Sequence, residues 1–348
     1  MNRRFLLPIM AVLVLVVAWM AIFGLGMLSS QSDVSMAVTG DVMFGRQVHN
    51  ALSLGSSPFD GVSNVTSNVD LLLINFENAA TISEVANKTD LPLKCSPGYT
   101  VLARANNNTV AALANNHVCD YGLKGMRDTF NALDKANITH LGAGNSETEA
   151  HMGLTQQING RQITILNYMD SNNFAGYSYD QIPYANGSNG GYSAYDADDA
   201  KSQIQSAKES GNFVMVFMHF GNEYSTSPND DQIKIAHQLI DDGADVVLGA
   251  HPHVAQGIEM YDGKPIFYSL GDFIFDLERE GTLDNYFVQI DLHDDKGICT
   301  VYPIHLTGYL PQYMSKENGT AFLNGLNPKC SQLEVTDEGI GKLEFSLD

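Results

Sequence analysis

The chain is long, moderately apolar and strongly acidic. With 348 residues, of which 44% are hydrophobic, it can bury a substantial core, and no internal repeat or coiled-coil pattern stands out. Its 19 basic and 40 acidic residues give a net charge of −21, which argues against nucleic acid and anionic lipid head groups as partners, because both bind basic patches. Acidity also serves solubility, so it does not by itself indicate a function.

Residues 5–28 form an apolar run that follows Arg3 and Arg4. The run has no charged side chain and, as a helix, is long enough to cross about 30 Å of hydrocarbon. It exceeds the apolar region of about 7 to 15 residues that is typical of a cleaved signal peptide, and residues 26–32 offer no clear small-x-small cleavage site. We therefore expect an uncleaved membrane anchor, with a cleaved signal peptide as the alternative.

The distribution of arginines predicts the orientation of this anchor. Two basic residues precede the span and none follows it before Arg46, which places the N-terminus in the cytoplasm. We expect an anchor over residues 1–30 and one extracytoplasmic domain over residues 31–348. The protein would then be a single-pass protein of the cell membrane.

The four cysteines show no CxxC spacing, which argues against a zinc ribbon. Outside the cell they could form disulfides, for example Cys95 with Cys119 and Cys299 with Cys330. The connectivity does not follow from the sequence.

Short apolar runs alternate with segments of helical periodicity. Residues 70–76 are almost continuously apolar, as is typical of a strand buried on both faces, and residues 122–136 carry an apolar stripe at helical spacing. Residues 171–196 are rich in Asn, Gly, Ser and Tyr, which predicts a long loop, either a lid beside a site or an ordinary surface excursion. Further strands are expected at 34–38, 110–113, 139–141, 213–218, 246–248, 265–269, 286–292 and 298–306, and further helical segments at 99–105, 198–210 and 228–242.

This order of elements predicts the fold class. Strands alternate with helices over most of the chain, and several strands then follow one another near the end. Such an order favours an α/β sandwich with mixed sheets. Ligands in open α/β folds bind at the carboxyl ends of the strands.

Polar side chains follow five of the expected strands, at the point where each strand ends. Taken singly, each has an ordinary explanation, such as a helix cap, an ion pair, a turn or a buried histidine. Together they offer carboxylate, amide and imidazole donors, which suit manganese, iron or zinc better than calcium alone. The sequence therefore predicts a metal site built from distant segments, with the ligands Asp41, Glu77, Asn116, His219, His251 and His253.

Five segments in order carry a resemblance to a known family. They are TGDVMFGR, INFENAAT, ALANNHVCDYGLKGMRDTFNAL, HFGNEYSTSP and GAHPHVAQGIEMYDGKPIFYSLGDFIFD, and they span roughly residues 34–310. The chain resembles the CapA family of capsule or poly-γ-glutamate synthesis proteins, which is similar in turn to the calcineurin-like metallophosphoesterases. The resemblance implies a four-layer α/β/β/α sandwich of two mixed sheets that holds two divalent metal ions.

The resemblance also implies a role for each ligand. Asp41 and His253 would hold the first metal, and Glu77 would bridge the two. His117 would protonate the leaving group or stabilise the transition state. The second metal would be held by Asn116, His219 and His251.

This chain departs from the metallophosphoesterase pattern at two positions and from the CapA pattern at a third. Met43 stands where the first motif has a histidine ligand, so the first site is weak, differently completed or empty. Glu77 is longer than the aspartate usual at the bridging position. Asp272 stands where the CapA family commonly has asparagine.

Two main functions follow from this set of residues. The first is a metal-dependent hydrolase acting on a phosphoester or an anionic surface polymer, with Arg46 holding an anionic group of the substrate or forming an ion pair. The second is a non-catalytic binding component of a polymer synthesis or export complex, beside other membrane proteins. A purely structural surface protein is a third possibility. The absence of GxxxxGK[ST] and GxSxG motifs argues against ATP-driven ligation and serine hydrolysis.

Overall fold

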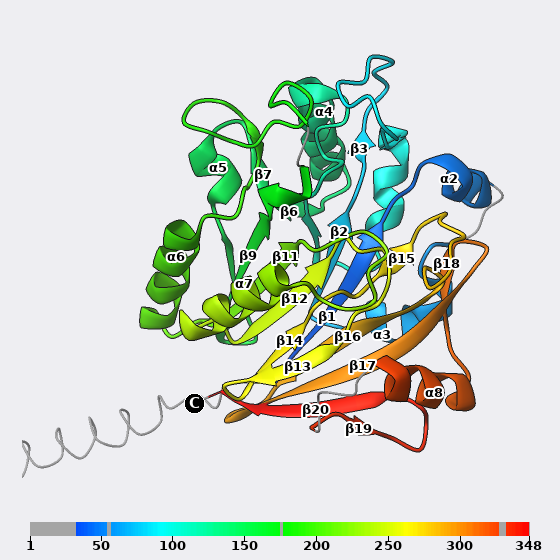
Figure 1. Ribbon diagram of the computed structural model, residues 1–348, viewed down its shortest axis with the longest axis vertical. Coiled ribbons are helices and arrows are strands. Elements are labelled where there is room, and N and C mark those ends of the chain that lie inside the picture. The colour runs from blue at the N-terminus through cyan, green and yellow to red at the C-terminus, as the bar shows by residue number, and fades with distance from the viewer. Residues whose placement is uncertain (1–32, 54–56, 175–176, 327–331, 348) are drawn as a thin grey trace, which may run out of the picture.

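The computed structural model describes residues 33–53, 57–174, 177–326 and 332–347 (Figure 1). The expected membrane segment, 5–28, lies outside these residues. Within the described ranges, no helix has the length and apolar character that a membrane crossing requires.

The first sheet contains ten of the described strands and is mixed. Its order is β19-β20-β17-β16-β1-β2-β5-β6, with β15 beside β1 and β18 beside β17. The strands β15, β1, β2, β5 and β6 are parallel neighbours, and the remaining pairs are antiparallel. The bounds are β1 Val34–Val42, β2 Leu71–Phe76, β5 Thr109–Ala112, β6 Thr139–Leu141, β15 Asp272–Ile274, β16 Asp284–Leu292, β17 Lys296–Thr307, β18 Leu310–Tyr313, β19 Glu334–Val335 and β20 Gly341–Ser346.

The second sheet contains six of the described strands, in the order β13-β14-β12-β11-β9-β8. The four central strands are parallel, and each edge strand joins its neighbour as an antiparallel hairpin. The bounds are β8 Leu154–Ile158, β9 Arg161–Met169, β11 Phe213–His219, β12 Val246–Ala250, β13 Ile258–Tyr261 and β14 Lys264–Phe267. Two-stranded pairs join β3 (Ala79–Ala80) to β4 (Lys94–Cys95) and β7 (Ala143–Gly144) to β10 (Gly191–Tyr192).

The two sheets pack face to face, and helices cover their outer faces (Figure 1). One apolar cluster between the sheets joins Leu73 of β2 to Phe217 of β11. Separate clusters lie under α4 on the first sheet and under α6 and α7 on the second. The mixed α/β class expected from the sequence is confirmed. The helices are α2 Arg46–Ser53, α3 Ser63–Thr66, α4 Gly122–Lys135, α5 Glu147–His151, α6 Ala197–Glu209, α7 Asp230–Asp241 and α8 Lys316–Leu326, with 3-10 turns η1 Asp60–Val62, η2 Pro97–Ala103 and η3 Ser171–Phe174.

Many element boundaries differ from the sequence-based expectation, and the strand β9 was not expected. Three of the differences are informative. The strand expected at 34–38 continues to Val42, because β2 and β15 both pair with its end. The helix expected from residue 228 begins at Asp230, because Asn229 caps it by accepting a hydrogen bond from the Gln232 N–H. The segment expected to be helical at 99–105 is the 3-10 helix η2.

The disulfide suggested between Cys95 and Cys119 is wrong. Both residues are buried free thiols in the described part of the chain, and Cys299 is a third. Burial in apolar surroundings raises the pKa of Cys95 to about 12, so this thiol stays protonated. Cys330, the other suggested partner, lies outside the described residues.

Candidate metal centre

The six predicted ligands meet at the carboxyl ends of strands from both sheets. Asp41 lies in β1, Glu77 follows β2, and His219 ends β11. The pair His251 and His253 follows β12, and Asn116 lies in the loop after β5. All six side chains are buried. The tertiary fold thus gathers residues that are more than 200 positions apart in the sequence.

In the first of two groups, three donor atoms lie around one nitrogen, His219 Nε2. His219 Nε2 lies 2.9 Å from Asn116 Oδ1 and 3.1 Å from His251 Nδ1. The Glu77 carboxylate oxygen Oε1 lies 3.9 Å from the same nitrogen. These are the residues predicted to hold the second metal, together with the predicted bridging carboxylate.

The second group surrounds His253 Nδ1. Asp41 Oδ2 lies 3.3 Å from this nitrogen, and Asp272 Oδ1 lies 2.8 Å from it. Ligand atoms of Asp41, His253 and Asp272 lie within 4.8 Å of one another, as do those of Asp41, Glu77 and His219. Asp272 was not among the predicted ligands. Its one signal in the sequence was the departure from the asparagine usual in the family.

Asn75, which was also not predicted as a site residue, orients two of the carboxylates. Its amide nitrogen donates to Asp41 Oδ1 at 2.7 Å and to Glu77 Oε2 at 3.3 Å. The amide of Asn115 fixes this orientation by donating to Asn75 Oδ1 at 3.1 Å. The opposite oxygens, Asp41 Oδ2 and Glu77 Oε1, have no hydrogen-bond partner among the described residues and face the other donors. Buried carboxylate oxygens in this condition fit a cation.

The loop that carries the histidine pair is strained. His251 has φ 102° and His253 has φ 59°, in the left-handed region that residues with a Cβ rarely adopt. Each such residue costs about 1–3 kcal/mol and persists only where its surroundings hold it. The conformation directs both rings into the cluster from either side of Pro252.

The charges of the cluster are unbalanced. Burial, and then the charge of Asp41, raise the pKa of Glu77 well above its ordinary value. Burial likewise raises the pKa of Asp272 to about 7, although His253 opposes the shift. Burial, and then the charge of His253, lower the pKa of His251 to about 3. The cluster therefore holds more carboxylates than it can ionise together, a condition that a bound cation relieves.

His117 lies beside the predicted ligands, next to Glu77. Its Nδ1 donates to Asp120 Oδ2 at 2.6 Å, and its Nε2 lies 4.0 Å from Glu77 Oε1. Burial lowers the pKa of His117, although the charge of Asp120 acts to raise it. The Asp120 carboxylate also accepts a hydrogen bond from the Leu93 N–H at 2.5 Å and lies 3.9 Å from Lys88 Nζ. The imidazole therefore has one defined orientation, with Nε2 toward the cluster.

Met43 does not take part in the centre. Its side chain is fully buried in the apolar cluster beneath α4, and its sulfur accepts a hydrogen bond from the Gly45 N–H at 2.8 Å. The histidine ligand of the metallophosphoesterase pattern thus has no replacement at this position.

Arg46 stands at the mouth of the centre and forms an ion pair. Its Nε donates to Asp276 Oδ2 at 3.0 Å, so the ion pair considered from the sequence does form. The side chain remains about one-third exposed and lines a cavity of about 130 Å³. Tyr177, from the long loop expected at 171–196, lines the same cavity. The other lining residues include Lys88, His117, His251 and His253.

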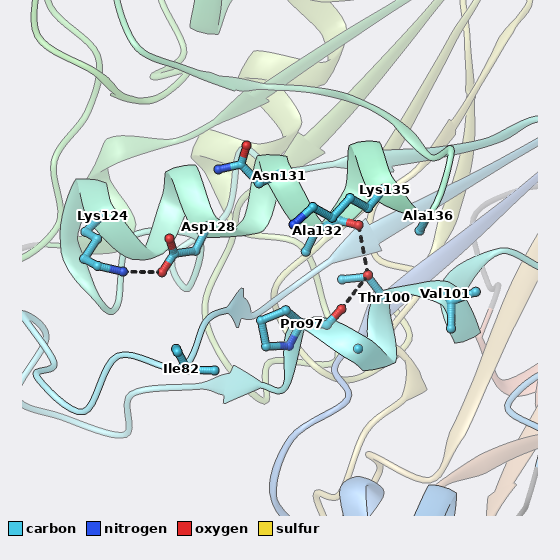
Figure 2. Close-up of a pocket in the computed structure, with 11 residues that line it drawn as sticks. Ile82, Pro97, Thr100, Val101, Lys124, Asp128, Asn131, Ala132, Lys135 and Ala136 are labelled. Atoms are coloured by element: carbon cyan, nitrogen blue, oxygen red, sulfur yellow. Dashed lines mark hydrogen bonds and ion pairs between the residues drawn. The ribbon is translucent and has the colours of Figure 1, made fainter.

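A separate groove of about 720 Å³ lies between α4 and η2 (Figure 2). Thr100 of η2 donates hydrogen bonds to the carbonyls of Pro97 at 2.8 Å and Ala132 at 3.1 Å, and the second of these bonds joins η2 to α4. An ion pair between Lys124 and Asp128 lies farther along α4. None of the predicted ligands lines this groove. The predicted chemistry therefore belongs to the smaller cavity.

The fold and the site define a mixed α/β protein whose buried carboxylate, amide and imidazole groups could bind a metal. Residues 35–277 match the family model of the bacterial capsule synthesis protein PGA_cap. The chain belongs to this family, which confirms the resemblance found in the sequence.

Two similar proteins support this family membership. The PGA biosynthesis protein CapA of Bacillus subtilis (strain 168) is 31% identical over 98% of this chain and 90% of its own length. The capsule biosynthesis protein CapA of Bacillus anthracis is 30% identical over 88% of this chain and 77% of its own length. Among solved structures, Chaetomium thermophilum Vps29 matches over 90% of this chain and 95% of its own, at 7% identity and a TM-score of 0.32.

Proposed function

We propose that this protein is a metal-dependent hydrolase of capsule or poly-γ-glutamate biosynthesis or export, anchored in the cell membrane with its domain outside. Two observations support the pathway: the family membership and the names of the CapA relatives. The apolar run at 5–28 supports the anchor. One observation supports the proposal of a metal-dependent hydrolase. Buried donor atoms converge from four strand ends and a loop, and two of the carboxylate oxygens have no hydrogen-bond partner among the described residues.

The arrangement suits hydrolysis of a phosphate ester or a related acyl bond. A pair of divalent ions, when bound, supplies Lewis-acid activation of water and of the bond to be cleaved. Asp41, Glu77, His219, His251 and His253 would hold these ions. Asn116 completes the set with a neutral oxygen.

The remaining polar residues of the cavity act on the substrate. His117, held by Asp120, presents Nε2 toward the cluster and would donate a proton to the leaving group. Arg46 and Lys88 line the cavity and would bind an anionic group. The substrate would thus be an anionic surface polymer or a phosphoester from its synthesis, handled beside other membrane proteins of the same pathway.

Metal content and turnover test this proposal. The full-length protein, purified in detergent, should contain manganese, iron or zinc, and should hydrolyse a generic phosphodiester when Mn²⁺ is added. His117→Ala should retain the metal and lose activity by about 100-fold or more. His237→Ala is the matched control, because His237 pairs with Glu259 and stacks on Tyr261, away from the cluster. If the wild-type protein contains no metal above background, the proposal that it is a metal-dependent hydrolase is refuted.

A non-catalytic binding component is the second candidate. The position of Met43 favours it, because a histidine ligand of the phosphoesterase pattern is replaced by a side chain buried in the core. Bound metal without turnover of phosphoesters or polyglutamate, and without any change in His117→Ala, would support this candidate over the hydrolase.

A further inference from the structure

We propose that Asp272 is a direct ligand of the first metal and replaces the histidine that Met43 displaces. The proposal rests on the proposed metal centre and goes further, since it names the residue that completes the first site. Without Asp272, that site has Asp41, His253 and the bridging Glu77. With Asp272 it has four side chains, the number usual for a stable site of this kind.

The backbone holds Asp272 beside Asp41. Strand β15 pairs with β1 in parallel, with Asp41 and Asp272 as register partners. The Asp41 N–H donates to the Gly271 carbonyl at 3.0 Å. A Cβ on Gly40 would lie 1.8 Å from that carbonyl oxygen, so the two strands approach this closely only because residue 40 is glycine. The position of Asp272 is thus built into the sheet.

The contacts of His253 distinguish a ligand from a supporting residue. A carboxylate that only orients a metal-bound histidine contacts the ring nitrogen that faces away from the metal. Here Asp41 Oδ2 and Asp272 Oδ1 both contact Nδ1 of His253, at 3.3 Å and 2.8 Å. All three residues therefore point at one common position.

The second oxygen of Asp272 gives independent support. The residue is fully buried, and its Oδ2 has no hydrogen-bond partner among the described residues. A buried carboxylate oxygen that no protein donor satisfies is costly, and a cation would satisfy it.

The assignment makes the two sites chemically different. Carboxylates from Asp41, Glu77 and Asp272, with one imidazole, form an oxygen-rich first site that suits Mn²⁺. The second site, with two imidazoles, is richer in nitrogen and suits Zn²⁺ or Fe²⁺. We expect the two sites to select different ions when both are offered.

Metal stoichiometry gives the first test. Metal-free full-length protein is dialysed against Mn²⁺, and bound metal is counted per chain. Wild type should bind two ions. Asp272→Asn should lower the affinity for one of them by more than about tenfold and leave the affinity for the other unchanged. The control is Asp245→Asn, whose carboxylate is equally buried but pairs with Lys208 and Lys264. It should bind two ions as wild type does.

A cysteine substitution separates direct coordination from orientation. Asp272→Cys titrated with Cd²⁺ should show the ultraviolet thiolate-to-metal charge-transfer band, because only a sulfur bound to the ion produces it. Wild type carries its own buried thiols and should show none. If Asp272→Cys binds Cd²⁺ without this band, or if Asp272→Asn binds two Mn²⁺ as wild type does, the assignment is overturned while the metal centre stands. Wild type that binds no metal would instead remove the proposed function itself.

Discussion

His117 and Asp120 form a buried hydrogen-bonded pair, with Nδ1 of the histidine 2.6 Å from Oδ2 of the aspartate. The aspartate is fixed in turn by the Leu93 N–H. The pair lies next to Glu77, so a histidine with one defined orientation stands beside the candidate metal ligands. This relationship gives the first prediction.

Asp120→Asn should lower kcat by about 10- to 100-fold with metal content unchanged, because His117 would lose the acceptor that orients its ring. The pH profile of kcat should also shift, since Asp120 opposes the effect of burial on the pKa of His117. The measurements are steady-state kinetics across pH and metal analysis. A variant with wild-type rate and profile would show that Asp120 serves only the fold.

Asn75→Ala should weaken metal binding by about 10- to 100-fold, because its amide holds one oxygen of Asp41 and one of Glu77. The measurement is a Mn²⁺ titration of metal-free protein. Asn167→Ala is a matched control: Asn167 is also buried, but it bonds to the Ala114 N–H and the Phe217 carbonyl. If both variants bind Mn²⁺ equally well, Asn75 does not support the ligands.

Metal binding near neutral pH should release protons. The pKa of Glu77 is raised well above its ordinary value in the metal-free protein, first by burial and then by Asp41, so this carboxyl keeps its proton to a higher pH than an ordinary glutamate, and a bound metal ion would displace that proton. Calorimetry in two buffers of different ionisation enthalpy measures the release. Glu77→Gln should release fewer protons, and equal release from both proteins would contradict the shift.

The stability of the metal-free protein should depend on His251. Its folded-state pKa of about 3 lies below the value of about 6.5 in the unfolded chain, so the unfolded state binds more protons between these values. This residue therefore makes the free energy of unfolding rise as pH rises through that window, by at most about 1.4 kcal/mol per pH unit.

Urea unfolding with a chelator present, at about pH 4.5 and about pH 6.5, measures the effect. His251→Gln should show a shallower rise between the two values. The pKa of His219 is also lowered, first by burial, and this histidine remains in the variant. If the free energy of unfolding rises with pH as steeply in the variant as in wild type, His251 is not held neutral.

Gly40→Ala should destabilise the protein by about 1–3 kcal/mol and weaken metal binding, because the new Cβ would force β15 away from β1. Thermal unfolding and a Mn²⁺ titration measure both effects. Gly98→Ala is the control, since a Cβ there would meet only Ser96 Oγ, at 3.9 Å. Wild-type stability in Gly40→Ala would show that the strands can separate without cost.

Sequence analysis alone predicted the mixed α/β class, the family, nine of the described strands and the helices α4, α6 and α7. Runs such as 70–76 are apolar on both faces, and the spacing of apolar residues along 122–136 fits a helix, so local periodicity was enough. It also indicated the six predicted ligands, because a polar residue directly after a buried strand is conspicuous.

Only the tertiary structure placed Asn75 and Asp272 beside those ligands. Both lie in or next to strands where a polar residue has several ordinary explanations. Asn75 lies opposite Asp41 because β2 pairs with β1, and Asp272 lies opposite Asp41 because β15 does so from the other side. The close approach of β15 depends on the absence of a side chain at Gly40. The tertiary structure also decided against the Cys95–Cys119 disulfide, since a pairing depends on how the chain brings two distant segments together and sequence spacing carries no such information.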